Sequence, residues 1–161
     1  MTNSLETQVG RLLQERKLKL VLAESCTGGL FGSRITDVPG SSEYFLGGVV
    51  AYAYEAKVDL LNVSWDTLNT KGAVSRETVL EMARGIRDLL KGDIAMSVSG
   101  IAGPGGATPE KPVGTTWIGF VTAEEEWAKI FYFTGDREGN KTAAVDAALN
   151  LLLDYLQGMQ T

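Results

Sequence analysis

Ser25 is the residue whose type and position best suit nucleophilic chemistry. It comes shortly after the apolar run Leu20–Ala23 and before Cys26, Thr27 and two glycines, a pattern that predicts a buried strand ending in a polar turn. In open α/β sheets the carboxyl ends of the strands usually build the functional site. We therefore predict Ser25 as a nucleophile beside backbone amides that could face an anion. The local sequence leaves an alternative equally open, in which the Ser25 hydroxyl caps the helix that follows.

The chain contains no histidine among its 161 residues. This excludes a Ser-His-Asp triad, a Cys-His dyad and a histidine-rich metal site. The base for Ser25 must then be Lys, Tyr, Asp or Glu. Lys57 follows the second predicted strand, so it could reach the same edge of the sheet and act as the base if burial lowers its pKa. The alternative for Lys57 is a solvated helix residue.

Three further side chains near these two positions have two interpretations each. Tyr52, at the end of the second strand, could relay a proton or orient the lysine amine, or it could only pack. Glu24 could orient Lys57 or pair with another nearby cation, and we assign it no role. Cys26 is a rival nucleophile, but without a histidine to activate the thiol an inert buried residue is the better interpretation.

A glycine-rich and proline-rich loop runs from Gly100 to Gly114. Its pattern is neither a dinucleotide-binding fingerprint nor a P-loop. The loop could donate backbone N–H groups to an oxyanion or a substrate, or it could be a rigid crossover. Further along, Arg137 opens the last helix, where its guanidinium could bind a phosphate or be an ordinary surface charge.

Segments with helical or strand spacing of apolar residues alternate along the chain with turn-forming residues. Their order predicts a three-layer α/β/α fold, with a mixed, mostly parallel sheet and a late antiparallel hairpin. Gly47 and Gly48 in the second strand indicate a bulge or a close approach of backbone. We expect helices at 4–16, 29–35, 55–61, 75–91 and 142–156, a helical turn at 65–68, and strands at 18–23, 44–52, 93–99, 115–123 and 127–134.

The composition is typical of one globular domain spanning residues 1–161, with 44% hydrophobic and 22% charged residues. No apolar run approaches the roughly 20 residues that span a bilayer, and the amino terminus lacks a signal pattern, so we expect a soluble cytoplasmic protein that binds no membrane. The single cysteine cannot form an internal disulfide. The net charge of -5 argues against a nucleic-acid surface.

Four motifs in this order carry a resemblance to a known family. They are Ala23-Glu24-Ser25-Cys26-Thr27-Gly28-Gly29, Tyr52 with Glu55-Ala56-Lys57, Ser99-Gly100-Ile101-Ala102-Gly103-Pro104 with Lys111-Pro112-Val113-Gly114-Thr115, and Gly135-Asp136-Arg137. Together they cover nearly the whole chain, which resembles the CinA carboxy-terminal domain family. The characterised members of that family are nicotinamide mononucleotide amidases.

The resemblance implies hydrolysis of nicotinamide mononucleotide to nicotinate mononucleotide and ammonia, without a metal or another cofactor. It implies Ser25 as nucleophile, Lys57 as general base and Tyr52 as an assisting hydroxyl. The partner it implies is a small-molecule nucleotide, and the sequence leaves a homo-oligomer open. The substrate-binding residues we expect are Thr27, Gly28, Gly29, Gly100, Gly103 and Arg137.

Two-domain members of this family carry a further amino-terminal domain associated with pyrophosphatase activity on ADP-ribose, for which this chain has no room, so we expect no such activity. Two alternatives to the amidase interpretation remain. One is a catalytically silent domain that binds a nucleotide or a partner protein. The other is an amidase that acts on a different carboxamide.

Overall fold

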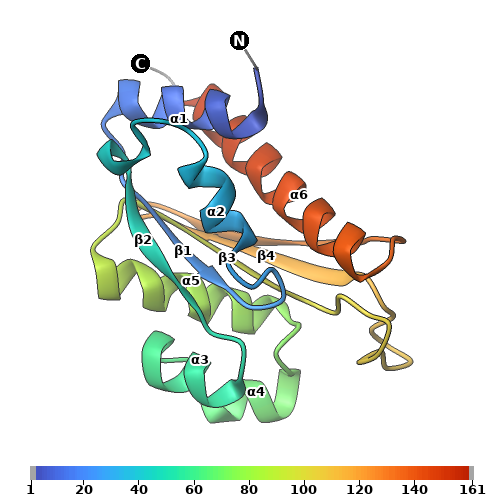
Figure 1. Cartoon of the computed structure of the whole chain (residues 1–161). Helices are drawn as coiled ribbons and strands as arrows, with labels where there is room; N and C mark the ends of the chain where they lie inside the picture. Colours follow the sequence, from blue (N-terminus) through green and yellow to red (C-terminus); the bar gives the residue numbers. More distant parts are fainter. Residues whose placement is uncertain (1–2, 160–161) are drawn as a thin grey trace.

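The sheet at the centre of the molecule has five strands in the order β2-β1-β3-β4-β5. The computed structural model describes residues 3–159 (Figure 1). β1 is parallel to β2 and β3, whereas β4 is antiparallel to β3 and β5. Four of these strands therefore point the same way, as the prediction of a mixed, mostly parallel sheet required. The strands are β1 Leu20–Glu24, β2 Phe45–Val50, β3 Ile94–Gly100, β4 Thr115–Val121 and β5 Glu126–Tyr132.

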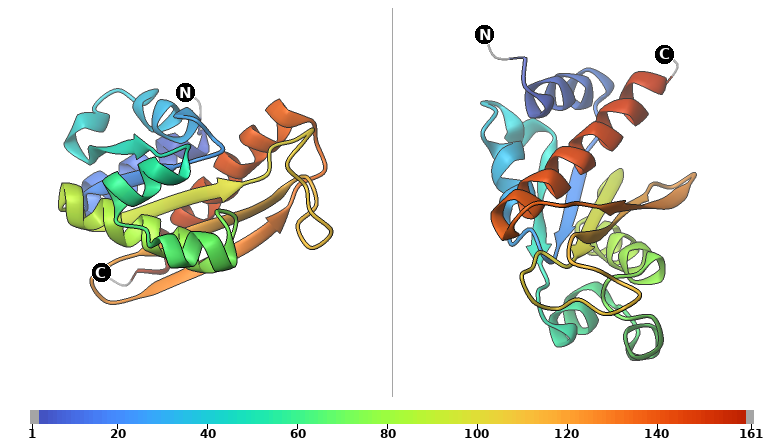
Figure 2. Two further views of the ribbon diagram at one scale, coloured as in Figure 1. Left: turned by 90° about the horizontal axis from the view of Figure 1, so that it is seen from below. Right: turned by 90° about the vertical axis from the view of Figure 1, so that its right-hand side faces the viewer.

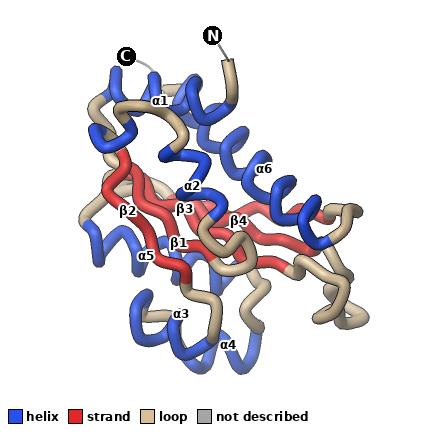
Figure 3. Tube along the Cα trace, in the orientation of Figure 1, coloured by secondary structure: helices blue, strands red, loops and turns tan. Residues whose placement is uncertain are grey.

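Helices cover both faces of this sheet and confirm the three-layer prediction (Figures 1 and 3). One face carries α1, α2 and α6, and the other carries α3, α4 and α5, which the two turned views of Figure 2 also show. The bounds are α1 Leu5–Arg16, α2 Leu30–Thr36, α3 Tyr54–Leu61, α4 Trp65–Lys71, α5 Arg76–Leu90 and α6 Arg137–Gly158, with a short 3-10 helix at Ser41–Glu43.

The last helix begins five residues before position 142, the start predicted from the helical spacing of its apolar residues. Asp136 is its N-cap and accepts a hydrogen bond from the Gly139 N–H. The first turn holds polar and glycine residues, so it contributes no apolar periodicity, although a carboxylate at the N-cap satisfies its free N–H groups. Arg137 is the first residue of α6, which confirms the expectation that it opens the last helix.

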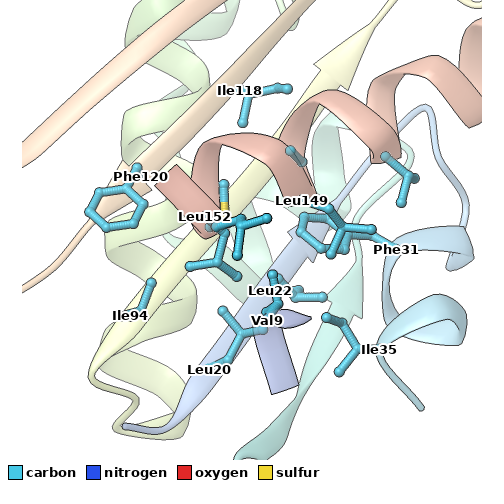
Figure 4. Close-up of a cluster of buried hydrophobic side chains, with 14 of the residues drawn as sticks. Val9, Leu20, Leu22, Phe31, Ile35, Ile94, Ile118, Phe120, Leu149 and Leu152 are labelled. Atoms are coloured by element: carbon cyan, nitrogen blue, oxygen red, sulfur yellow. The ribbon is translucent and has the colours of Figure 1, made fainter. Parts of the chain in front are cut away.

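The strand β1 lies between two hydrophobic cores. Leu20 and Leu22 pack with α1, α2 and α6 residues in one core (Figure 4), and Val21 and Ala23 pack with α3, α4 and α5 residues in the other. All five residues of β1 are buried. Burial on both faces explains why the first four residues of β1 are all apolar and do not alternate with polar ones.

The crossovers that connect β1 to β2 and β2 to β3 bring the carboxyl ends of these three strands together. The crossover from β1 to β2 runs over one face through α2, while the crossover from β2 to β3 runs over the other face through α5. Such a reversal defines the crevice where open α/β sheets bind ligands. Here the Ser25 N–H donates to the Val98 carbonyl at 3.0 Å, and the Ala51 N–H donates to the Glu24 carbonyl at 2.8 Å.

Both features indicated by the paired glycines of β2 are present. The register passes from Leu20 opposite Phe45 to Val21 opposite Gly47, so one residue of β2 is bulged. At Gly48 a Cβ atom would lie 2.6 Å from the Leu22 carbonyl oxygen. The absence of a side chain therefore lets β2 lie close against β1.

Gly85 sets the position of α3 and generates the first prediction. A Cβ atom at Gly85 in α5 would collide with the carbonyl oxygen of Leu61, the last residue of α3. We expect Gly85→Ala to lower the free energy of unfolding by about 1–3 kcal/mol in urea denaturation, because overpacking outweighs the better helix propensity of alanine. Gly158→Ala, at a helical glycine with nothing within 4 Å of the new Cβ, is the matched control and should not destabilise. Equal effects of the two substitutions would contradict this explanation.

Candidate active site

Ser25 and Lys57 are in direct contact. The Lys57 Nζ lies 2.9 Å from the Ser25 Oγ, although 32 residues separate the two positions along the chain. Ser25 follows the end of β1, and Lys57 is in the first turns of α3, which follows β2. The Lys57 side chain is 1% exposed and Ser25 is 7% exposed. The alternative of a solvated helix lysine is therefore wrong for Lys57.

The remaining contacts of the Lys57 amine are with main-chain carbonyls. It donates to the Ala51 oxygen at 2.8 Å and to the Tyr52 oxygen at 3.0 Å. Burial lowers the pKa of Lys57 from 10.5 to about 8, and the nearby Cys26 opposes this shift. In the neutral form the two amine hydrogens can stay on the carbonyls, which directs the nitrogen lone pair to the Ser25 hydroxyl. The arrangement is that of a base positioned to take the serine proton.

Cys26 does not compete with this serine under ordinary conditions. Its side chain is buried, and burial raises the pKa of the thiol to about 11. The nucleophilic form of cysteine is the thiolate. Cys26 is thus protonated at neutral pH, in agreement with the interpretation of an inert thiol.

Glu24 caps α2, a role that differs from both interpretations of this residue. Its buried carboxylate accepts hydrogen bonds from the Thr27 hydroxyl at 2.6 Å and from the N–H groups of Gly29 at 3.2 Å, Phe31 at 2.9 Å and Gly32 at 3.0 Å. These are the free donors at the start of a helix, which a negative charge stabilises. The cap that the sequence offered to the Ser25 hydroxyl is therefore supplied by Glu24, and Ser25 contacts Lys57 instead.

A cavity of about 250 Å³ opens beside the Ser25–Lys57 contact. Six of the expected site residues line it, together with Ser99 of the glycine-rich motif and with Ala73 and Val74, which sequence reasoning missed. The expected residues that line the cavity are Ser25, Tyr52, Lys57, Gly100, Gly103 and Arg137.

Thr27, Gly28 and Gly29 lie in the turn that follows Ser25 and are not part of the cavity lining. The Thr27 hydroxyl donates to Glu24, the Gly28 N–H donates to the Ser25 carbonyl at 3.1 Å, and the Gly29 N–H donates to Glu24. Their expected contact with substrate stays a prediction, whereas their observed contacts hold the turn that carries Ser25.

Arg137 connects the tyrosine to the glycine-rich loop. Its Nη2 donates to the Tyr52 hydroxyl at 3.1 Å, and its Nη1 donates to the Gly103 carbonyl at 2.7 Å. Tyr52 is 59% exposed, so its hydroxyl faces Arg137 at the mouth of the cavity while its main-chain oxygen contacts Lys57. Asn140, also missed from the sequence, donates to the Ala102 carbonyl at 3.0 Å and fixes the same loop.

Two negative findings apply to residues 3–159. No three His, Cys, Asp or Glu side chains come together as a group that could hold a metal ion. None of the helices in this range combines the length and the apolar character needed to cross a membrane.

Comparison with known proteins identifies the family of this α/β/α domain. Residues 2–156 match the model of the CinA C-terminal domain. A CinA-like protein of Chlorobaculum tepidum is 51% identical over 98% of this chain, and one of Thermotoga maritima is 49% identical over 97%. The chain belongs to the CinA C-terminal domain family. It spans 38% of the length of these curated relatives.

Solved structures extend the likeness to the whole fold. The competence damage-inducible protein A of Klebsiella pneumoniae is 37% identical with a TM-score of 0.93, and the match covers 97% of each chain. The competence/damage inducible protein CihA of Agrobacterium tumefaciens is 36% identical with a TM-score of 0.89, covering 98% of each chain.

The cap formed by Glu24 generates a stability prediction. Glu24→Ala leaves several buried N–H and O–H donors without an acceptor, so we expect the free energy of unfolding to fall by about 3 kcal/mol. Ser64→Ala is the matched control because Ser64 caps α4 at an exposed site away from the cavity. It should cost about 1 kcal/mol. A loss at Glu24 no larger than that at Ser64 would contradict the role of Glu24 as the buried anchor of this turn.

The lowered pKa of Lys57 generates a prediction about pH. Between pH 8 and 10.5 the unfolded chain binds more protons at Lys57 than the folded chain, so this group makes stability rise with pH across that window. Lys57→Met lacks the effect. The free energy of unfolding of the wild type minus that of Lys57→Met should therefore increase by up to about 3 kcal/mol from pH 7 to above pH 10. A difference that does not change with pH would show an ordinary lysine pKa.

Proposed function

We propose that this chain is an amidohydrolase that converts nicotinamide mononucleotide and water to nicotinate mononucleotide and ammonia. The observation that carries the proposal is the 2.9 Å contact between the buried Lys57 amine and the Ser25 hydroxyl. Membership of the CinA C-terminal domain family supports the choice of substrate. Because the chain spans only 38% of its curated relatives, the activity is proposed for this domain alone.

Neutral Lys57 begins the reaction by accepting the proton of Ser25. The Ser25 Oγ attacks the carboxamide carbon of the substrate, and a tetrahedral intermediate with a negative oxygen forms. Backbone N–H groups aimed at that oxygen would stabilise it. The amides of Gly105 and Gly106, which line the cavity, suit this role better than those of Gly28 and Gly29, which already donate within their own turn.

Protonated Lys57 then returns the proton to the leaving nitrogen. The C–N bond breaks, ammonia leaves, and the acyl group stays on Ser25 as an ester. Water enters, Lys57 takes its proton, and the hydroxide adds to the ester carbon. The proton finally passes from Lys57 to the Ser25 oxygen as the acid departs, which restores both side chains.

Ammonia release from nicotinamide mononucleotide tests the assignment. We expect Ser25→Ala and Lys57→Met to lower kcat by about 1,000-fold or more, because the nucleophile and its base act as one unit. Ser33→Ala and Lys71→Met change exposed residues outside the cavity and serve as matched controls. Both should retain the rate of the wild type.

Three outcomes would contradict part or all of this proposal. Binding of the nucleotide in calorimetry without ammonia release by the wild type would indicate a silent binding domain. Undiminished release by Ser25→Ala would remove Ser25 as the nucleophile. Release from another carboxamide but not from nicotinamide mononucleotide would keep the chemistry and change the substrate.

A further inference from the structure

A second hollow adjoins the active-site cavity at Arg137. It has a volume of about 460 Å³ and is lined by Leu30 at the start of α2 and by Arg137, Glu138, Lys141 and Thr142 of α6. Arg137 also lines the cavity that holds Ser25 and Lys57. A ligand whose reacting end lies against Ser25 could therefore extend past Arg137 into this hollow.

Lys141 is the cation of this hollow that has no partner within the described part of the chain. The four ion pairs found among residues 3–159 all use arginines, and the Lys141 amine donates no hydrogen bond to another residue in this range. Glu138 lies one turn earlier on the same helix face, yet its carboxylate is not within 4.0 Å of the Lys141 amine. An unpaired ammonium in a hollow is a ready partner for an anion.

The Lys141 amine lies near the turn that carries Ser25. A Cβ atom on Gly28 would lie 4.0 Å from the Lys141 Nζ, within ordinary van der Waals contact. Gly28 itself is bonded to the Ser25 carbonyl through its N–H. Lys141 is thus close to the loop of the nucleophile without contacting the reacting atoms.

Arg137 is less free than Lys141 to bind a ligand. Each of its two Nη atoms already donates a hydrogen bond inside the protein, one to the Tyr52 hydroxyl and one to the Gly103 carbonyl. The hollow is lined by two positive side chains, Arg137 and Lys141, and by one negative side chain, Glu138. It therefore carries one net positive charge in a chain whose net charge is -5. This local excess favours an anionic group and makes Lys141 the side chain available to contact it.

We propose that this hollow binds the phosphate of a nucleoside monophosphate substrate and that Lys141 is its specificity-determining residue. The inference rests on the proposed amidase function, since it takes the carboxamide to lie at Ser25. The phosphate is the strongly anionic group of nicotinamide mononucleotide, and a charge-assisted hydrogen bond to Lys141 would hold that end of the substrate. Nicotinamide riboside, which has no phosphate, gains nothing from this contact.

The experiment compares these two substrates in the wild type, Lys141→Met, Lys141→Arg and the remote control Lys129→Met. We expect Lys141→Met to lower kcat/KM for the mononucleotide by about 10- to 100-fold, mainly through KM. The loss for the riboside should be at least tenfold smaller. Lys141→Arg keeps the charge and should recover most of the lost kcat/KM, and Lys129→Met should behave as the wild type.

Equal losses for both substrates, or a loss confined to kcat, would overturn the phosphate subsite and indicate that Lys141 positions the loop. If the wild type hydrolyses neither substrate, the proposed function fails separately. Calorimetry of the same two compounds then decides the inference. Weaker binding of the mononucleotide alone to Lys141→Met would support the subsite, and unchanged binding would overturn it.

Discussion

The burial of one amine among neutral oxygen atoms is the interaction on which the rest of this site depends. Lys57 is 1% exposed, and its contacts are the Ser25 hydroxyl and the carbonyls of Ala51 and Tyr52. A carboxylate in this place would keep the lysine charged, whereas burial beside neutral acceptors lowers its pKa to about 8. A protein without histidine thereby obtains a base that is partly neutral near physiological pH.

The surrounding fold holds this amine and its serine from three directions. The parallel register of β1 and β2 places the end of one strand beside the carbonyls that end the other. Close packing of α3 on α5 at Gly85 fixes the helix that carries Lys57. The carboxylate of Glu24 ties down the turn that carries Ser25. Burial of a polar group is tolerated only where its partners are fixed, and these contacts supply that rigidity.

Much of the fold and part of the site could be predicted from the sequence. Strand periodicity and the lack of histidine led to Ser25 and Lys57 at neighbouring strand ends. The main-chain oxygens that receive Lys57 could not be predicted, because a carbonyl leaves no mark in the sequence. The cap from Glu24 was missed because sequence does not tell which way a side chain turns. Lys141 was not singled out, since its proximity to Gly28 depends on the packing of α6 across the sheet.

The pH dependence of kcat/KM for deamidation of nicotinamide mononucleotide tests the central claim most directly. If neutral Lys57 activates Ser25, the rate should rise tenfold per pH unit at low pH and level off above a single midpoint near pH 8. A profile that is flat between pH 6 and 9, or a midpoint near the ordinary lysine value of about 10.4, would contradict the account.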